Sequence, residues 1–237
     1  MAKFVLLVEG NICAGKSEFV RYLDQHKDAF AAFLKPEEGE VVSIPEFVDH
    51  EALQLFYHDM RRYTDIFENS CLTGRQVRQM KAKEGKGVYI FDRSMIGGAE
   101  TFAKNSFCEG YFSHAGYNRY ISDLKESLDA LDRTQQKSWL EQLVVYLQVT
   151  DVTLLQERQR KRDTQGEVIP AGYLERLNRR YNEWIENIDK VYDSYGVNAP
   201  RVITINANLD FRQHSTYHTD ILQTITSTMK GMKVHER

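Results

Sequence analysis

The chain has few cysteines, and none of them lies in a pattern that holds a metal ion or a disulfide framework. Its 237 residues include only three, Cys13, Cys71 and Cys108, an odd number at wide spacing without a CxxC pair. Small secreted domains and zinc fingers both need several closely spaced cysteines. Both classes are therefore excluded, and we expect a reduced, intracellular protein.

Long apolar runs are also missing. No apolar stretch approaches the ~18 residues needed to span a bilayer. The short apolar run near the start of the chain is followed by no small-residue cleavage site. We therefore expect a protein that has no membrane partner, is made without export and works in the cytoplasm.

An excess of positive charge is absent as well. The formal net charge is −3 and the pI is about 6.2, whereas proteins that bind nucleic acid along its backbone are usually basic. The seven histidines are scattered, without a pair at metal-ligand spacing. We expect no nucleic-acid partner, and a local basic cluster needs a local explanation.

Apolar content, in contrast, is sufficient for one complete core. Hydrophobic residues make up 42% of the chain, and no repeat or domain linker divides it, so residues 1–237 are expected to form a single domain. Helix-length segments separate five short apolar runs, which predicts a three-layer α/β fold with a five-stranded parallel sheet between helices. The runs are Phe4–Val8, Val41–Ile44, Val88–Phe91, Leu143–Val149 and Val202–Ile205.

The first predicted strand leads into a glycine-rich loop that matches GxxxxGK[ST] and precedes a helix. Glycines allow backbone N–H groups to surround phosphate oxygens, the lysine brings charge to the β- and γ-phosphates, and the serine hydroxyl can bind Mg²⁺. The loop predicts a P-loop site for a nucleoside triphosphate. Its residues are Gly10, Asn11, Ile12, Cys13, Ala14, Gly15, Lys16 and Ser17.

Charged residues follow the second and third predicted strands, which end in Ile-Pro-Glu-Phe at 44–47 and in Phe-Asp-Arg-Ser at 91–94. Ligands of parallel sheets bind beyond the carboxyl ends of the strands. There Glu46 could accept a proton from an attacking hydroxyl, Asp92 could help to hold Mg²⁺, and Arg93 could neutralise phosphate or orient the acceptor. Helix capping or a surface ion pair is the alternative, and the nearby P-loop favours the functional interpretation.

A basic cluster, Arg-Gln-Arg-Lys-Arg at residues 158–162, follows the fourth predicted strand. We predict a mobile lid over about residues 158–168 that reaches over the transferred phosphate. A solvated helix face and a nucleic-acid patch are the alternatives. The absence of interleaved aromatic residues disfavours nucleic acid.

These motifs, in this order, resemble the deoxyribonucleoside kinase family along nearly the whole chain. The matching stretches are GNICAGKS, IPEFV, LFYHDMRRYTDIFEN, FDRS, FAKNSFCEG, ERQRKR, GYLERL and INANLDF. The resemblance implies a homodimeric transferase that uses ATP and Mg²⁺ to phosphorylate the 5′-hydroxyl of a deoxyribonucleoside, as in nucleotide salvage. It also implies that two helices of each subunit form the interface.

The resemblance assigns roles in the reaction to individual residues. Glu46 corresponds to the general base for the 5′-hydroxyl, Arg93 to the arginine beside it, and Asp92 to the carboxylate on the magnesium side. Arg158 and Arg162 correspond to the lid arginines on the phosphates. The order Pro45-Glu46 departs from the glutamate-proline order usual in the family, which bears on how Glu46 is presented.

Other matching positions concern the two substrates. Tyr57 and Glu167 match positions that hold the sugar 3′-hydroxyl, and Phe102 of FAKNSFCEG is expected beside the nucleoside. The INANLDF stretch would surround the adenine of ATP through Asn208, Asp210 and Phe211.

The expected base pocket departs from the family pattern at two positions. Glu68 stands where the family usually has a glutamine that hydrogen-bonds the base edge, and Gly98 stands where several members have an aspartate. An ionised glutamate offers acceptors only and suits the adjacent donors of guanine, and the room at Gly98 also suits a purine. Arg75, two helical turns beyond Glu68, could contact guanine O6/N7 or pair with Glu68. We expect a purine substrate, with deoxyguanosine as the best candidate.

Two other functions fit parts of the sequence. A nucleoside monophosphate kinase shares the P-loop, sheet and arginine lid but needs extra cations for the phosphate of its acceptor, and the acidic Glu46 argues against such an acceptor. A catalytically silent P-loop scaffold shares the fold without the reaction, and intact Lys16, Ser17 and Asp92 argue against it. We expect an enzyme whose partners are ATP and a small nucleoside.

Overall fold

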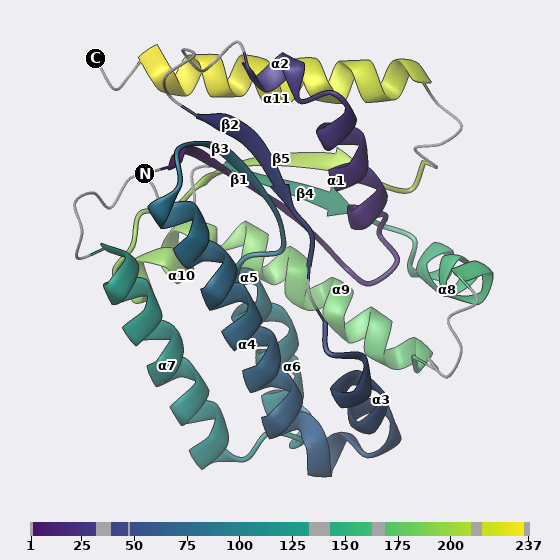
Figure 1. Ribbon diagram of the computed structural model, residues 1–237. Helices are drawn as coiled ribbons and strands as arrows, with labels where there is room; N and C mark the ends of the chain where they lie inside the picture. The colour runs from purple at the N-terminus through teal and green to yellow at the C-terminus, as the bar shows by residue number, and fades with distance from the viewer. Residues whose placement is uncertain are drawn as a thin grey trace.

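The computed structural model describes residues 2–31, 39–46, 48–132, 143–162, 169–209 and 215–234 (Figure 1). Five parallel strands form its sheet in the order β2-β3-β1-β4-β5. The strands are β1 Ala2–Gly10, β2 Glu40–Ile44, β3 Gly87–Asp92, β4 Leu143–Gln148 and β5 Arg201–Asn206. Each of the five apolar runs therefore forms a strand, and the predicted parallel sheet is confirmed.

Helices cover both faces of the sheet, which gives the predicted three layers. In Figure 1, α1 and α11 lie on one face, and α4, α7 and α9 lie on the other. The helices are α1 Lys16–Gln25, α2 Asp28–Ala31, α3 His50–His58, α4 Met60–Glu84, α5 Met95–Gly98, α6 Lys104–Cys108, α7 His114–Asp132, α8 Val152–Arg162, α9 Ala171–Glu186, α10 Ile188–Ser194 and α11 Ser215–Val234. A π-helical segment, η2 Ala99–Ala103, joins α5 to α6.

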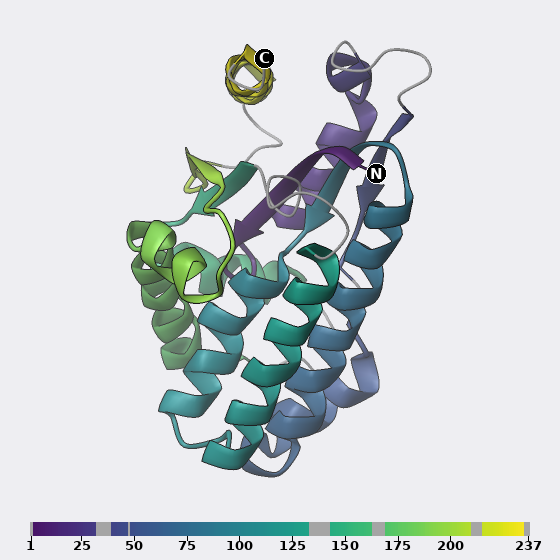
Figure 2. The same cartoon turned by 90° about the vertical axis from the view of Figure 1, so that its left-hand side faces the viewer.

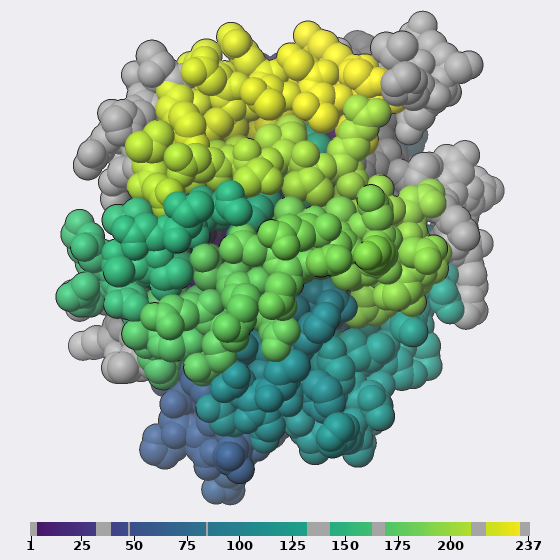
Figure 3. All heavy atoms as spheres, turned by 180° about the vertical axis from the view of Figure 1, so that it is seen from behind, coloured from purple at the N-terminus to yellow at the C-terminus, as the bar shows by residue number. Residues whose placement is uncertain are grey.

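The three central strands are apolar because both of their faces are covered. Phe4–Val8 of β1 and all six residues of β3 are buried, as are the first five residues of β4. Seen from behind, α11 and α9 lie across this side of the molecule (Figure 3). This packing holds the carboxyl ends of the strands in fixed positions.

Helix α4 connects the core to the surface. It packs against α3, α7 and α5, and Figure 2 shows it running alongside α7. One face of α4 carries a buried stripe that includes three charged side chains, Glu68, Arg75 and Arg78. None of the described helices is long and apolar enough to cross a membrane.

Candidate active site

A cavity of about 950 Å³ opens where the carboxyl ends of the strands meet α3, α4 and α8. Most of the residues predicted for the site line it: Ile12, Cys13, Ala14, Gly15, Lys16, Ser17, Glu46, Tyr57, Glu68, Arg75, Asp92, Arg93, Phe102, Arg158, Arg162 and Asn208. Glu167, Asp210 and Phe211 lie outside the described residues, as does most of the predicted lid beyond Arg162. The structure thus brings segments from six parts of the chain to one cavity.

The P-loop backbone has positive φ angles at three positions. Gly10 and Gly15 have φ values of 153° and 97°, and Cys13 has a left-handed φ of 63°. A side chain at Gly10 would also approach the Leu147 carbonyl oxygen to 2.9 Å. The loop ends at the N-terminus of α1, where backbone N–H groups lack intrahelical partners. Lys16 Nζ donates to the Asn11 carbonyl at 3.0 Å, and burial lowers the pKa of Lys16 to about 8.

Three predicted residues, Gly10, Asn11 and Gly98, are not in the cavity lining. The Asn11 side chain turns toward α9 and donates to the Leu174 carbonyl at 2.9 Å. The side-chain oxygen of Asn11, Oδ1, accepts from the Ile12 N–H at 2.8 Å. Asn11 therefore fastens the P-loop to α9 through its side chain, and only its backbone is turned toward Lys16.

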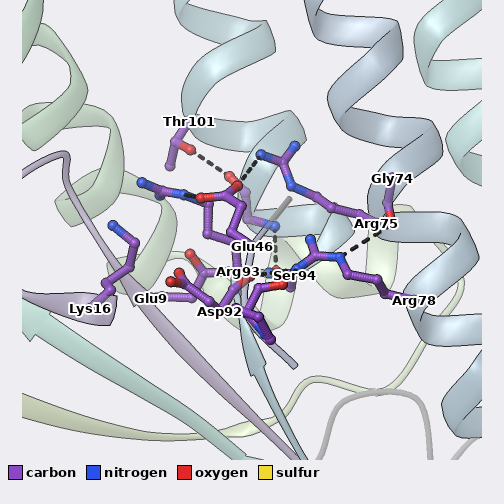
Figure 4. Close-up of polar contacts among 12 residues, drawn as sticks. Glu9, Lys16, Glu46, Gly74, Arg75, Arg78, Asp92, Arg93, Ser94 and Thr101 are labelled. Carbon is purple, nitrogen blue, oxygen red and sulfur yellow. Dashed lines mark hydrogen bonds and ion pairs between the residues drawn. The ribbon is translucent and has the colours of Figure 1, made fainter. Parts of the chain in front are cut away.

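Glu46 lies between two buried arginines (Figure 4). Its Oε2 accepts from Arg93 Nε at 2.7 Å and its Oε1 from Arg75 Nη2 at 2.9 Å. Burial alone would raise the pKa of Glu46, but the charges of Arg93, Arg75 and Lys16 outweigh it and lower the pKa to about 2. The alternative of a surface ion pair is excluded, because the side chain is only 16% exposed.

Arg93 has a backbone conformation that costs free energy in residues other than glycine. Its φ is 68°, in the left-handed region. The guanidinium donates to the Gly10 carbonyl at 2.9 Å and to the Tyr181 hydroxyl, and it lies 4.5 Å from the centre of the Phe102 ring. Burial lowers the pKa of Arg93, but the charge of Glu46 and of other neighbours raises it above its usual value. Arg93 therefore stays cationic.

Glu9, near the end of β1, holds the backbone next to Arg93. Its side chain is fully buried at the end of β1, and its Oε1 accepts from the Ser94 N–H at 2.6 Å. Burial raises the pKa of Glu9, although Arg93 and the Ser94 hydrogen bond lower it. A side chain at Gly97 would approach Glu9 Oε1 to 2.4 Å. Glu9 thus fixes the backbone immediately after Arg93.

Arg78 ties the ends of β2 and β3 together. Its Nη1 donates to the Pro45 carbonyl at 2.8 Å and to the Asp92 carbonyl at 3.3 Å. These carbonyls directly precede Glu46 and Arg93. Arg78 is therefore a buried donor on α4 that holds the backbone immediately before Glu46 and Arg93 (Figure 4).

Ser17 and Asp92 form an oxygen-rich corner next to Lys16. Ser17 Oγ donates to Asp92 Oδ2 at 3.2 Å, and Asp92 Oδ1 is buried without a hydrogen-bond partner among the described residues. Mg²⁺ prefers hard oxygen ligands and usually takes few from the protein when phosphates supply others. The pair fits this ion, although the described residues contain no cluster of three or more metal-ligating side chains.

Glu68 lies in the wall of the cavity and is 1% exposed. Ser106 Oγ donates to its Oε1 at 3.1 Å. Burial raises the pKa of Glu68 to about 7, against the opposing effects of Arg75 and Ser106. The expectation of a carboxylate that offers acceptors only is therefore corrected: near neutral pH the side chain is a mixture of carboxylate and carboxylic acid, and the acid offers one donor and one acceptor.

Arg75 makes its hydrogen bond to Glu46 rather than to Glu68. The room expected at Gly98 is occupied by the Arg75 guanidinium, because a Cβ atom at Gly98 would lie 2.3 Å from Arg75 Nη1. The missing side chain at Gly98 thus makes space for Arg75, not directly for a base. The expectation that Gly98 leaves room for a purine base is therefore corrected.

The basic end of α8 lies at the opposite wall. Arg158, Lys161 and Arg162 line the cavity, and Arg158 Nη2 donates to the Asn208 carbonyl at 3.2 Å. The Asn208 side chain accepts from the Thr150 N–H at 3.0 Å and donates to Thr150 Oγ1 at 2.6 Å. Asn208 therefore joins the segment after β5 to the segment before α8, and the cations of α8 line the same cavity as the P-loop.

A family model described as deoxynucleoside kinase matches residues 6–230. The chain belongs to the deoxynucleoside kinase family. Membership confirms the predicted fold and makes this kinase an ATP-dependent nucleoside kinase, a P-loop transferase, as the motifs indicated.

This kinase is similar to several named proteins. Deoxycytidine kinase 2 of Gallus gallus is 24% identical over 237 residues, which cover 93% of this chain and 88% of that protein. Protein 029R of Invertebrate iridescent virus 3 is 30% identical over 190 residues, 80% of this chain and 86% of that protein. Among solved structures, deoxyadenosine kinase from M. mycoides with bound dATP is 21% identical in sequence and has a TM-score of 0.68. The superposition covers 94% of this chain and 98% of the M. mycoides chain.

Sequence reasoning missed two supporting residues of this kinase, Glu9 and Arg78. The signal for Arg78 was present, because Glu68, Arg75 and Arg78 are spaced by seven and three residues and so share one helical face. Glu9 carried a weaker signal, a single charge at the end of an otherwise apolar strand.

Proposed function

We propose that this kinase transfers the γ-phosphate of ATP to the 5′-hydroxyl of a deoxyribonucleoside. The observation that carries the proposal is the position of Glu46, a largely buried carboxylate held by Arg93 at 2.7 Å and Arg75 at 2.9 Å in the wall of the P-loop cavity. A carboxylate there suits a neutral hydroxyl acceptor and repels an anionic one.

Each residue has its own role in the proposed phosphoryl transfer. Glu46 accepts the proton of the 5′-hydroxyl, and Arg93 holds the carboxylate and lies beside the acceptor oxygen. Lys16 and the P-loop N–H groups hold the phosphates, and Arg158 and Arg162 approach them from α8. Ser17 and Asp92 would hold Mg²⁺, which supplies charge neutralisation on the phosphates when bound.

Tyr57 and Phe102 support a nucleoside in the neighbouring part of the cavity. Tyr57 lies 6.5 Å from Tyr173, ring centre to ring centre, in an edge-to-face arrangement, which gives the sugar and base an aromatic wall. Glu167 would hold the 3′-hydroxyl with Tyr57, and Asn208, Asp210 and Phe211 would surround the adenine of ATP.

For the base, we keep deoxyguanosine as the proposed best substrate within a purine preference. The ionised form of Glu68 accepts from the N1–H and the amine of guanine. The acid form suits adenine, which presents one acceptor and one donor on the same edge. Because burial raises the pKa of Glu68 to about 7, both forms are available near neutral pH and the ranking of the two purines depends on pH.

The whole chain is proposed to work as a single domain and as a homodimer in the cytoplasm. Support for a dimer comes from one face of α4, where Ile66, Val77 and Met80 are 63%, 53% and 36% exposed. Exposed apolar residues that recur along one helix face favour association with a second copy.

An acceptor screen tests the proposed function. Purified protein is incubated with Mg·ATP and each of the four deoxyribonucleosides, and separately with the four monophosphates, and products are separated by chromatography. Formation of nucleoside monophosphates, dGMP above the others, is expected. Turnover of monophosphates alone would replace the proposal with a nucleoside monophosphate kinase, and no turnover with any acceptor would favour a silent scaffold.

A further inference from the structure

A buried hydroxyl group on α9 lies against the guanidinium of Arg93. Tyr181 is fully buried, and its Oη accepts a hydrogen bond from Arg93 Nη1. The same nitrogen donates to the Gly10 carbonyl at 2.9 Å. Each terminal nitrogen of a guanidinium carries two hydrogens, so the carbonyl and the hydroxyl provide one acceptor for each hydrogen of Nη1.

The hydroxyl proton of Tyr181 has an acceptor of its own. Tyr181 Oη donates to Glu9 Oε2 in a long hydrogen bond of 3.5 Å, and Glu9 Oε1 accepts from the Ser94 N–H at 2.6 Å. A hydroxyl that donates to a carboxylate keeps its lone pairs for another donor, which here is Arg93. Since Arg93 Nε donates to Glu46 Oε2 at 2.7 Å, hydrogen bonds connect four side chains from Glu9 to the proposed general base.

The aromatic ring of Tyr181 packs in a cluster that does not need the hydroxyl. Its centre lies 5.9 Å from the ring of Tyr146 in a stacked arrangement. It also lies 6.2 Å from the ring of Trp184 and 6.2 Å from that of Phe102. A phenylalanine would make the same ring contacts. Core packing therefore explains the ring but not the hydroxyl, whose donor is a residue of the active site.

The orientation of Arg93 has to be imposed by its surroundings. Its φ of 68° costs free energy in a residue other than glycine, and its side chain lines the cavity while being only 6% exposed. A guanidinium held through Nη1 by the Gly10 carbonyl alone could pivot about that bond. The Tyr181 hydroxyl, as a second acceptor on Nη1, fixes the plane of the guanidinium and so directs Nε toward Glu46.

Resting on the proposed function, we propose that Tyr181 is a positioning residue whose hydroxyl holds the Arg93 guanidinium in the orientation that supports Glu46. Tyr181 is not part of the cavity lining, so it acts on the reaction through Arg93. Without the hydroxyl, one N–H of a buried cation loses its acceptor, which is costly, and the guanidinium turns toward another one. Glu46 then loses its alignment with the hydroxyl of the acceptor.

Tyr181→Phe tests the proposal because it removes only the hydroxyl. With Mg·ATP and the deoxyribonucleoside that the wild type phosphorylates fastest, kcat is expected to fall on the order of tenfold or more. The KM values for ATP and nucleoside are expected to change little, because the residues that line the cavity are all retained.

Tyr146→Phe is the matched control. It is the same substitution in the same aromatic cluster at a position that is also buried, but the Tyr146 hydroxyl donates to Asn182 Oδ1 at 2.8 Å and not to a residue of the active site. Both variants are expected to have a lower midpoint of thermal unfolding, because each loses a buried hydrogen bond. Only Tyr181→Phe is expected to lose kcat.

A double-mutant cycle separates positioning of Glu46 from general support of the fold. Tyr181→Phe is compared in the wild-type background and in Glu46→Gln, with labelled ATP in single-turnover experiments to measure the slower variants. If the hydroxyl acts through Arg93 on the carboxylate of Glu46, the ratio of rates with and without it is expected to fall to about one in the Glu46→Gln background. A merely structural role would give the same ratio in both backgrounds.

Glu9→Gln disturbs the same contact while Tyr181 is retained, and it decides the question if Tyr181→Phe does not fold. The amide keeps an oxygen for the Ser94 N–H, so its NH₂ group lies toward Tyr181 and donates where the carboxylate accepted. The Tyr181 hydroxyl then faces donors on both sides. A loss of kcat is again expected, with little change in KM and no loss in the Glu46→Gln background.

The outcomes distinguish this inference from the proposed function. A wild-type kcat in Tyr181→Phe, an equal loss in Tyr146→Phe, or the same loss in both backgrounds would overturn the role of Tyr181 and leave the kinase intact. If only Glu9→Gln folds, a wild-type kcat in that variant would overturn it as well. Failure of the wild type to phosphorylate any deoxyribonucleoside would instead overturn the proposed function.

Discussion

Glu68 shows how burial alters the chemistry of one side chain. A glutamate in water is ionised at neutral pH, but burial at 1% exposure raises the pKa of Glu68 to about 7. The acid dominates below that pH and the carboxylate dominates above it. The hydrogen-bonding pattern offered to the base therefore changes within the range in which the enzyme can be assayed.

The first prediction concerns the ratio of kcat/KM for deoxyguanosine to that for deoxyadenosine. Between pH 6 and pH 8 this ratio should rise on the order of tenfold or more, because the ionised fraction of Glu68 rises and favours guanine. Steady-state kinetics across this range checks it. In Glu68→Gln the ratio should not depend on pH, and a flat or falling ratio in the wild type would contradict the account.

At the scale of single elements, the carboxyl ends of β2 and β3 depend on a donor from α4. Arg78 donates to the Pro45 and Asp92 carbonyls, and a buried carbonyl such as that of Asp92 costs about 1–3 kcal/mol when it is left unpaired. A small displacement of Glu46 relative to Arg93 would also misalign the acceptor. Arg78 is therefore a positioning residue that acts through its neighbours.

The second prediction is that Arg78→Met lowers kcat on the order of tenfold or more while KM for ATP changes little, because the P-loop is not touched. Thermal unfolding should also show a lower midpoint. Lys81→Met, at an exposed position of the same helix, is the matched control and should leave both unchanged. A loss confined to stability, with normal kcat, would show that Arg78 has no positioning role.

The basic end of α8 supplies a third prediction. Arg162 and Arg160 are both exposed, but only Arg162 is part of the cavity lining. Arg162→Gln should reduce kcat/KM for ATP on the order of tenfold or more, and Arg160→Gln, the same change on the same helix, should have little effect. Equal effects of the two substitutions would indicate a general electrostatic contribution instead of a contact with phosphate.

At the scale of the whole molecule, the proposed dimer gives the fourth prediction. Val77→Glu places a charge in the exposed apolar face of α4 and should convert a dimer to a monomer in sedimentation velocity experiments. Leu55→Glu, on α3 at a position that is 43% exposed, should leave the dimer intact. A wild type that sediments as a monomer would remove the basis for the interface.

The elements of the fold were predictable because their signals are local. Each strand is a run of mainly apolar residues, of which the three central ones are buried on both faces, and the P-loop is a contiguous motif in a strand-to-helix context. The charged residues at the ends of β2 and β3 could be placed at one edge because parallel strands end together.

The supporting contacts were not predictable, because they depend on which buried groups meet in three dimensions. Nothing in the sequence around Arg75 shows that its guanidinium reaches Glu46, 29 residues away, or that it fills the space at Gly98. Likewise, the ionisation of Glu68 follows from burial, and burial of a charged residue within a helix is set by tertiary packing.

The most direct test of the central claim follows labelled γ-phosphate from ATP to the nucleoside in the wild type and in Glu46→Gln. The amide cannot accept the hydroxyl proton, so kcat is predicted to fall about 10²- to 10⁴-fold, with modest changes in the affinities for ATP and nucleoside. Glu40→Gln, the same substitution at an exposed position at the start of β2, should match the wild type. A Glu46→Gln variant that forms labelled 5′-monophosphate at the wild-type rate, or label found only on nucleoside diphosphates, would contradict the account.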